Sequence, residues 1–279
     1  MTTYYAILTC RNSEDKIEKA IISLLAQTMT PEYIIIINDG STDKTINIIE
    51  KLQMVFKNLY VITNPDLGYN IGRVVSNWNK AIKFAKENNL PQTDYHMITT
   101  DDTEYEFEYA EKILRHMEDE KTLAIASGNY DDNEYITPHG AGRFVRNSFF
   151  DKYHQLYPEK MGYESFVLHT ADHYGYRYKV FNEARFIHTR PLGTDHNFYE
   201  FGASMKTLGY HPLYVIGRFL IYLIDGKPIG RLGALHMIYH YLHYKPKSEG
   251  YDSMHDESMR KIIRDKQCNM IKRILRIEI

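Results

Sequence analysis

Four consecutive isoleucines followed by a short polar run constrain the fold of this 279-residue chain more than any other feature. The segment is Tyr33-Ile34-Ile35-Ile36-Ile37-Asn38-Asp39-Gly40-Ser41-Thr42-Asp43. A strand that is apolar at every position favours burial on both faces, which is typical of a parallel sheet. Gly40 permits a sharp turn, and Ser41 or Thr42 is expected to cap a helix over residues 44–57. The pattern places Asp39 at the carboxyl end of a strand, where open α/β sheets bind ligands; a capped turn without a ligand is the alternative.

Length, charge and cysteine content narrow the class of protein. A chain of this length buries a sizeable core, and a net charge of -2 offers no basic field for nucleic acid. Cys10 and Cys268 cannot form a disulfide framework, and the first residues show no secretion signal. The longest apolar run, residues 213–224, is shorter than the ~20 residues that a membrane-spanning helix needs. We therefore expect a cytoplasmic protein, either soluble or peripheral on the inner face of the cell membrane.

Predicted strands alternate with predicted helices through the first half of the chain. The strands are expected at residues 4–10, 33–37, 59–63 and 95–100, and the helices at 12–27, 44–57, 72–88 and 107–117. Asn12 or Ser13 is expected to cap the first of these helices. This alternation favours an α/β fold with a doubly wound, mostly parallel sheet. Further strands are expected at 121–127 and before residue 146, and a helix from Gly162 to about Gly175.

The fourth predicted strand ends in Thr99-Thr100-Asp101-Asp102. Two adjacent carboxylates at a strand end are costly unless something positive neutralises them. Mg²⁺ or Mn²⁺ holding a diphosphate does so, because these ions take oxygen ligands and often only one or two from the protein. The alternative is that the two acids favour the start of the next helix.

Several segments in this order resemble the family 2 glycosyltransferases with the GT-A fold, over roughly the first 105 residues. They are residues 7–14 (ILTCRNSE), 23–28 (SLLAQT), 37–43 (INDGSTD) and the pair Asp101-Asp102. The combination of Ser-Leu-Leu-x-Gln-Thr with Asp-Gly-Ser-Thr-Asp is highly specific for that family. The resemblance implies a nucleotide-diphosphate-sugar donor, bound by Thr9, Arg11, Glu14, Asp39, Gly68, Asn79 and Asp101.

Within that set, the resemblance gives each residue a place. Thr9, Arg11 and Glu14 would lie around the base and ribose, and Asp39 would contact the base. Gly68 and Asn79 would belong to the loop and helix that complete the donor pocket.

The resemblance also implies a metal site for Mg²⁺ or Mn²⁺, with Asp101, Asp102 and His188 as its ligands. The family's metal motif is Asp-x-Asp, and this sequence departs from it because Thr99 or Thr100 stands in place of the first Asp. The last Asp of the motif is supplied by Asp101 or Asp102. For His188, the alternative is a structural histidine.

An acidic residue at the start of the helix that begins near Gly162 serves as general base in the family, often within a Glu-Asp pair. Here Glu164 is present and Ser165 follows it. Glu164 is therefore the expected catalytic base, taking the proton from an acceptor hydroxyl. The alternative is a carboxylate that stabilises the first turn of the helix.

From residue 197 the predicted structure becomes helical, with helices at 198–208, 213–224, 232–244 and 253–277. We expect residues 1–195 to form the GT-A catalytic domain and residues 196–279 a helical C-terminal extension. His236, His240 and His243 share a helical face, which suggests a polar stripe more than a zinc site. Within the last helix, residues 260–276 carry seven basic residues against Asp265 alone, namely Arg260, Lys261, Arg264, Lys266, Lys272, Arg273 and Arg276.

A basic amphipathic helix of this kind is typical of a membrane surface contact, and a core-packing helix with a solvated basic face is the alternative. This tail is similar to that of polysaccharide-assembling members of the family, so the expected acceptor is a glycan or a lipid-linked glycan. The predicted function is metal-dependent, inverting transfer of a sugar to an acceptor hydroxyl. The alternatives are a non-catalytic glycan- or membrane-binding protein with a decayed metal site, and a sugar-1-phosphate nucleotidyltransferase.

Overall fold

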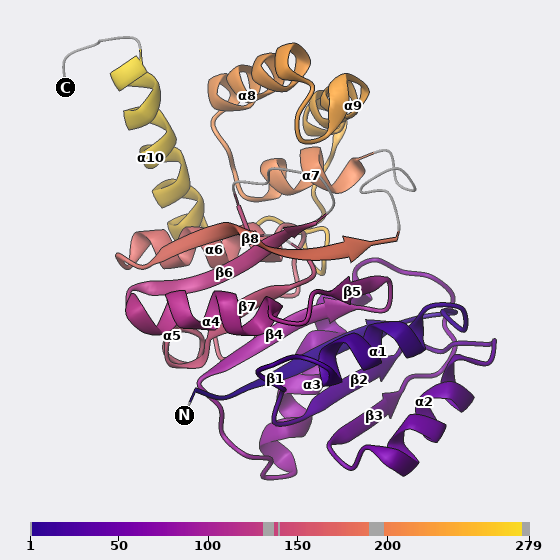
Figure 1. Ribbon diagram of the computed structural model, residues 1–279. Coiled ribbons are helices and arrows are strands. Elements are labelled where there is room, and N and C mark those ends of the chain that lie inside the picture. The colour runs from indigo at the N-terminus through magenta and orange to yellow at the C-terminus, as the bar shows by residue number, and fades with distance from the viewer. Residues whose placement is uncertain (1, 131–136, 139, 190–197, 275–279) are drawn as a thin grey trace. The chain divides into compact units, whose positions relative to one another are not determined.

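The isoleucine run forms β2 (Ile34–Asn38), whose five residues are all buried. The computed structural model describes residues 2–130, 137–138, 140–189 and 198–274 (Figure 1). In it β2 pairs in parallel with β1 (Tyr4–Cys10) on one side and with β3 (Leu59–Thr63) on the other. Its position between two parallel neighbours explains why every side chain of the run is apolar up to Asn38.

In the described part of the chain the sheet has eight strands in the order β3-β2-β1-β4-β7-β6-β8-β5. The remaining strands are β4 (Tyr95–Thr100), β5 (Thr103–Tyr105), β6 (Leu123–Tyr130), β7 (Arg143–Arg146) and β8 (Arg177–His188). β4 is parallel to β1, and β7 runs antiparallel to both β4 and β6. The expectation of a mostly parallel sheet is confirmed. β5 and the start of β8 are not predicted by the sequence, because β5 has three residues and β8 begins with exposed polar positions.

Helices cover both faces of this sheet. They are α1 (Ile17–Leu25), α2 (Thr45–Val55), α3 (Arg73–Glu87), α4 (Tyr109–Asp119) and α5 (Asn147–Tyr153). α1, α2 and α4 share one core with alternate residues of β1 and β2, among them Leu8 and Ile36. On the other face the Tyr5 ring lies against the His96 ring, which packs against Phe150 of α5. The sheet and these helices therefore form three layers, helix on sheet on helix.

The expected caps of α1 are wrong, because the helix begins at Ile17 without a side-chain cap. The Ser13 hydroxyl instead donates a hydrogen bond to the Asp101 carboxylate. The side-chain oxygen of Asn12 accepts a hydrogen bond from the backbone amide of Thr42, at 2.8 Å. These two side chains join the loops at neighbouring strand ends, which sequence spacing does not reveal.

The described residues group into two compact units. The first unit, residues 1–157 with 174–190, contains the sheet; the second, residues 158–173 with 191–279, is helical. Its helices are α6 (Tyr163–His173), α7 (Tyr199–Thr207), α8 (Pro212–Asp225), α9 (Gly230–His243) and α10 (Glu257–Ile274). A helical C-terminal region is thus confirmed, whereas the expected boundary at residue 195 lies outside the described residues. In the part of the chain that the structure describes, no helix combines the length and apolar composition needed to cross a membrane.

Candidate functional site

The carboxyl ends of β1, β2 and β4 bring the polar motif residues of the first unit together. In the parallel register Cys10 lies opposite Asn38, and Thr9 lies opposite Thr100. The residues that follow these strands therefore leave the sheet at the same edge. This edge is where open α/β sheets bind ligands.

Arg11, which follows β1, connects three of the loops at this edge. Its backbone amide donates to Asp101 Oδ2 at 3.2 Å, and its guanidinium donates to the backbone carbonyls of Asp39 and Gly40. The same guanidinium forms an ion pair with Asp66, at 2.7 Å between Nη2 and Oδ1. Arg11 is thus fixed by the backbone after β2 and by a carboxylate of the loop after β3.

Asp39, which follows β2, is held by two side chains that sequence analysis did not select. Arg73 donates to both carboxylate oxygens, with its Nε 3.2 Å from Oδ1 and its Nη2 3.0 Å from Oδ2. Asn64 donates to Oδ1 at 3.0 Å. Partial burial acts to raise the pKa of Asp39, but the hydrogen bonds from Arg73, Asn64 and Asn77 outweigh it and lower the pKa below its usual value. Asp39 is therefore an ionised acceptor at neutral pH.

One sequence signal could have pointed to Arg73. It is the first residue of α3, and a cation at a helix N-terminus is unfavourable beside the positive end of the helix dipole. Such a placement indicates that a carboxylate elsewhere compensates the charge. The partner, Asp39, lies 34 positions earlier in the chain.

The two carboxylates after β4 have different neighbours. Both are buried, at 5% exposure for Asp101 and 6% for Asp102. Asp101 accepts hydrogen bonds from the Arg11 amide and the Ser13 hydroxyl. Asp102 lies beside His188, with 3.7 Å between Oδ1 and Nε2. The pairing of β5 with β8 creates this neighbourhood, because it sets Thr103 opposite His188.

The two threonines before these carboxylates lie in different surroundings. Thr99 is fully buried, and its hydroxyl lies 3.0 Å from that of Thr103 and 2.7 Å from that of Tyr105. The Thr100 hydroxyl donates to Asp102 Oδ1 at 2.6 Å. Thr100 is therefore the threonine that touches the carboxylate pair, while Thr99 belongs to an interior hydroxyl cluster.

The donor set around Asp102 fits a divalent cation that is shared with a ligand. Among the described residues no group of three His, Cys, Asp or Glu side chains is arranged to hold a metal. A carboxylate and an imidazole do lie together at Asp102 and His188, and Mg²⁺ and Mn²⁺ commonly take one or two protein ligands with phosphate oxygens completing the shell. Asp101, by contrast, already accepts hydrogen bonds from the Arg11 amide and the Ser13 hydroxyl, which follow β1.

Glu14 belongs to a hydrogen-bonded link between the loops after β1 and β2. Its carboxylate accepts from the Lys44 amide at 2.9 Å, and its own amide donates to Asp43 at 3.1 Å. Asp43 also accepts from the amide of Thr45, the first residue of α2, at 3.0 Å. The expected cap by Ser41 or Thr42 is wrong, because α2 follows Lys44 without a side-chain cap and the Thr45 amide donates to Asp43 instead.

Gly68 and Asn79 lie in different surroundings. Gly68 is exposed, has a positive φ of +71°, and offers its carbonyl to Arg73. Asn79 is buried and exchanges two hydrogen bonds with the backbone of Tyr157, at 2.9 and 2.8 Å. The structure thus places Gly68 beside the Arg73–Asp39 pair and does not bring Asn79 to this group.

Glu164 lies in the first turn of α6, in the second unit. A second carboxylate of that unit, Glu200 in α7, accepts a hydrogen bond from Tyr251 at 2.9 Å. Burial raises the pKa of Glu200 to about 7, and the negative charge of Glu164 contributes to the rise. The two acids therefore interact, although sequence analysis selected only Glu164.

Comparison with known proteins identifies the family. The model of glycosyl transferase family 2 matches residues 5–183, which is more than half of the chain. This chain belongs to that family. Chondroitin synthase of Pasteurella multocida is 30% identical over 130 residues, 47% of this chain and 12% of that protein. A protein of Mycoplasma pneumoniae described as an uncharacterised glycosyltransferase is 27% identical over 115 residues, 40% of this chain and 36% of that protein.

Solved structures agree in fold. The mannosyltransferase PcManGT of Pyrobaculum calidifontis, in complex with GDP-Man and Mn²⁺, has a TM-score of 0.58 at 13% identity, covering 99% of this chain and 76% of that one. Residues 1–349 of TarS from S. aureus, in complex with UDP-GlcNAc, have a TM-score of 0.54 at 16% identity, covering 86% and 72%. The expected GT-A fold is confirmed. The chain spans about a third or less of the length of the two curated relatives.

Proposed function

We propose that this glycosyltransferase moves a sugar from a nucleoside-diphosphate donor to a hydroxyl of a glycan or a lipid-linked glycan. The observation that carries the proposal is the group of Arg11, Asp39 and Asp102 at the ends of three parallel strands. The structures of PcManGT with GDP-Man and of TarS with UDP-GlcNAc support a nucleotide-sugar donor for this fold. Chondroitin synthase and hyaluronan synthase of Pasteurella multocida, each 30% identical over 130 residues, support a glycan acceptor.

Asp39 would contact the nucleotide base. It is ionised, and a carboxylate offers about four acceptor positions, of which Arg73 and Asn64 use part. A base N–H could use the rest. Thr9, Arg11 and Glu14, which lie in β1 and the loop after it, would surround the base and the ribose.

Asp102 and His188 would hold Mg²⁺ or Mn²⁺, with Asp101 supporting them. The ion would offset the charge that develops on the departing diphosphate. Two buried, adjacent carboxylates beside an imidazole supply the negative potential that such an ion requires.

Glu164 would act as general base. In a single displacement the acceptor oxygen bonds to the anomeric carbon while the bond from that carbon to the diphosphate breaks. The hydroxyl proton passes to Glu164, the nucleoside diphosphate leaves, and the configuration inverts. Glu200 would be its acidic neighbour, because the charge of Glu164 contributes to the raised pKa of Glu200.

Peripheral membrane contact belongs to the same proposal, but α10 is not its best candidate. Met259 and Ile263 of that helix are buried in the core of the second unit. The Gln267 side chain accepts a hydrogen bond from the His211 amide at 2.7 Å. These contacts favour α10 as a structural brace with a basic outer face.

A donor screen tests the proposal. Purified protein is incubated with UDP- and GDP-sugars, with and without Mn²⁺, and released nucleoside diphosphate is measured. We expect slow hydrolysis of one donor class that stops when the metal is chelated. Asp39→Ala should lose the preference between UDP- and GDP-sugars. If the variant hydrolysed the donors at the same rates as the unmodified protein, the assigned base contact would be ruled out.

A further inference from the structure

The second unit exposes a row of large aliphatic side chains along α8. The row consists of Leu213, Ile216, Leu220, Ile221 and Ile224, which are 46–71% exposed. Their spacing of three and four residues puts them on one side of the helix. The helix is well delimited, because Pro212 begins it and Gly226, with φ +70°, ends it. α8 therefore presents a continuous apolar side to its surroundings.

α9 carries a second row with the same spacing. It consists of Leu232, Leu235, Tyr239 and Leu242, which are 49–68% exposed. α8 and α9 lie side by side (Figure 1). Together these nine side chains are called the apolar rows. Soluble proteins seldom leave so many neighbouring large apolar residues exposed without a partner.

The apolar rows cannot turn inward, because the opposite sides of both helices are already packed. Val215 of α8 and Met237 and Tyr241 of α9 are buried in one core. At Gly202 of α7 an added Cβ would lie 2.2 Å from the Met237 carbonyl oxygen and 2.6 Å from the Tyr241 amide nitrogen. This backbone contact between α7 and α9 fixes the rotation of α9, so both rows face away from the same core.

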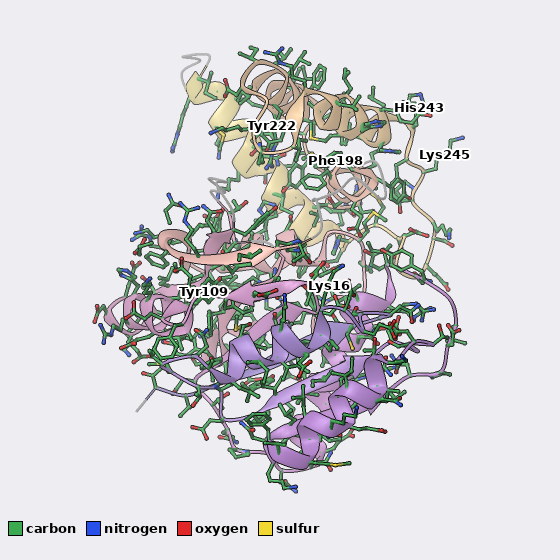
Figure 2. The ribbon with its side chains drawn as sticks, turned by 45° about the vertical axis from the view of Figure 1, so that its right-hand side comes forward. Lys16, Tyr109, Phe198, Tyr222, His243 and Lys245 are labelled. Atoms are coloured by element: carbon green, nitrogen blue, oxygen red, sulfur yellow. The ribbon has the colours of Figure 1, made fainter. Side chains whose placement is uncertain are left out.

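The charge around the rows is positive. Residues 212–248 contain one acid, Asp225, and five basic residues, namely Arg218, Lys227, Arg231, Lys245 and Lys247, of which Lys247 forms an ion pair with Asp252. Lys227 in the turn between the helices and Arg231 at the start of α9 are exposed. Lys245 is exposed just after α9 (Figure 2).

The basic residue in the middle of α8 does not interrupt the row. Arg218 is only partly exposed, and its Nε donates to the Tyr222 hydroxyl at 2.6 Å. Its guanidinium lies 5.2 Å from the centre of the Tyr222 ring. Exposed positive charge is thus confined to the ends of the apolar rows.

We infer that the apolar rows of α8 and α9 lie on the surface of an anionic phospholipid bilayer. Aliphatic side chains enter the boundary between headgroups and acyl chains, and flanking lysine and arginine meet the anionic headgroups. A second copy of this chain fits less well, because it would bring like charges together. The contact lies outside the group of Arg11, Asp39 and Asp102, and it rests on the peripheral membrane contact of the proposed function, which it assigns to α8 and α9.

Co-sedimentation with vesicles tests the inference. Full-length protein is mixed with phosphatidylcholine vesicles that contain either a quarter or no phosphatidylglycerol. We expect binding to the anionic vesicles that weakens at high salt. Each buried CH₂ group contributes a factor of about four to such partitioning, so combined Ile224→Gln and Leu232→Gln should lower it at least about tenfold.

Matched controls separate this contact from folding and from donor binding. Met54→Gln with Val55→Gln changes two exposed apolar residues of α2, and vesicle binding should be unaffected. Nucleotide binding by the Ile224→Gln, Leu232→Gln variant should equal that of the unmodified protein. Hydrogen exchange of the unmodified protein should slow at residues 212–243 when anionic vesicles are added.

Three results would overturn the inference. The unmodified protein could ignore anionic vesicles at low salt. The Ile224→Gln, Leu232→Gln variant could keep full vesicle binding, which would assign the contact to another surface such as α10. Sedimentation could instead reveal a dimer that the double substitution dissociates, which would make a second copy the occupant.

Discussion

In the first unit charged side chains lie inside, at the ends of β1, β2 and β4, whereas in the second unit large apolar side chains of α8 and α9 lie outside. Burying a charge is costly unless a partner compensates it, and Arg73 compensates Asp39 with two hydrogen bonds. Leaving a Leu or Ile exposed forgoes about 1.5–3 kcal/mol of burial. This difference indicates that the buried charges of the first unit and the exposed apolar side chains of the second lie where a bound ligand or surface would compensate them. A polar ligand suits the first unit, and an apolar surface suits the second.

Substitution of the proposed general base tests this division most directly, and it has the largest expected effect. Glu164→Gln should lower sugar transfer by ~10²–10⁴-fold and leave donor affinity unchanged, because only proton transfer is removed. Steady-state kinetics and nucleotide calorimetry check the two halves. Loss of donor binding in this variant would show that Glu164 of the second unit also affects the donor site of the first unit.

Two other acids serve as matched controls for Glu164. Glu183 lies 2.9 Å from His116, and Asp172 lies 2.5 Å from Lys266, so both acids already have side-chain partners at the surface. Glu183→Gln and Asp172→Asn should change transfer little. If either one abolishes transfer while Glu164→Gln does not, the base has been assigned to the wrong residue.

A pair of isoleucines in α10 separates structural from surface roles. Ile263 is 1% exposed and Ile274 is 72% exposed. Ile263→Ala should lower the free energy of unfolding by about 2–5 kcal/mol, and Ile274→Ala by less than about 0.5 kcal/mol. Urea denaturation measures both. Deletion of residues 256–279 should accordingly lower the melting temperature. If the two substitutions lowered the free energy of unfolding equally, α10 would not be packed in the core.

The cation site is tested by substitutions that distinguish Asp102 from Asp39. Asp102→Asn and His188→Gln should each weaken metal-dependent nucleotide binding by about 10–100-fold. Asp39→Ala should weaken binding with or without the metal, because its carboxylate would face the base. Calorimetry with and without Mn²⁺ compares them. A variant of Asp102 with unchanged metal dependence would exclude it as a ligand.

The smallest expected effect concerns pH. The pKa of Glu200, raised by burial to about 7 from 4.5, lets the folded protein hold a proton that the unfolded chain has lost. Stability should therefore fall as pH rises from about 4.5 to 7. Glu200→Gln removes this loss, so at pH 8 it should be about 1–2 kcal/mol more stable than the unmodified protein, with the difference fading towards pH 5. Urea denaturation across this range checks it, and a difference independent of pH would contradict it.

Sequence by itself determined the features that depend on local pattern. The apolar run of β2 and the alternation of strands with helices gave the parallel half of the sheet, because strand and helix periods are local properties. Turn residues after β1, β2 and β4 located Arg11, Asp39 and the pair Asp101-Asp102 at strand ends. For the same reason the family resemblance could be recognised in short segments.

Only the tertiary structure decided which of these side chains meet. Arg73 reaches Asp39 because β2 and α3 are neighbours in space, and His188 reaches Asp102 because β8 pairs with β5. Asn79 is committed to the backbone of Tyr157, a contact 78 positions away that no local pattern encodes. Each of the helices α8 and α9 is apolar on two opposite sides. Their sequences alone therefore do not show which side is buried and which is exposed. Packing against α7 made that choice, since Gly202 allows the backbones of α7 and α9 to touch.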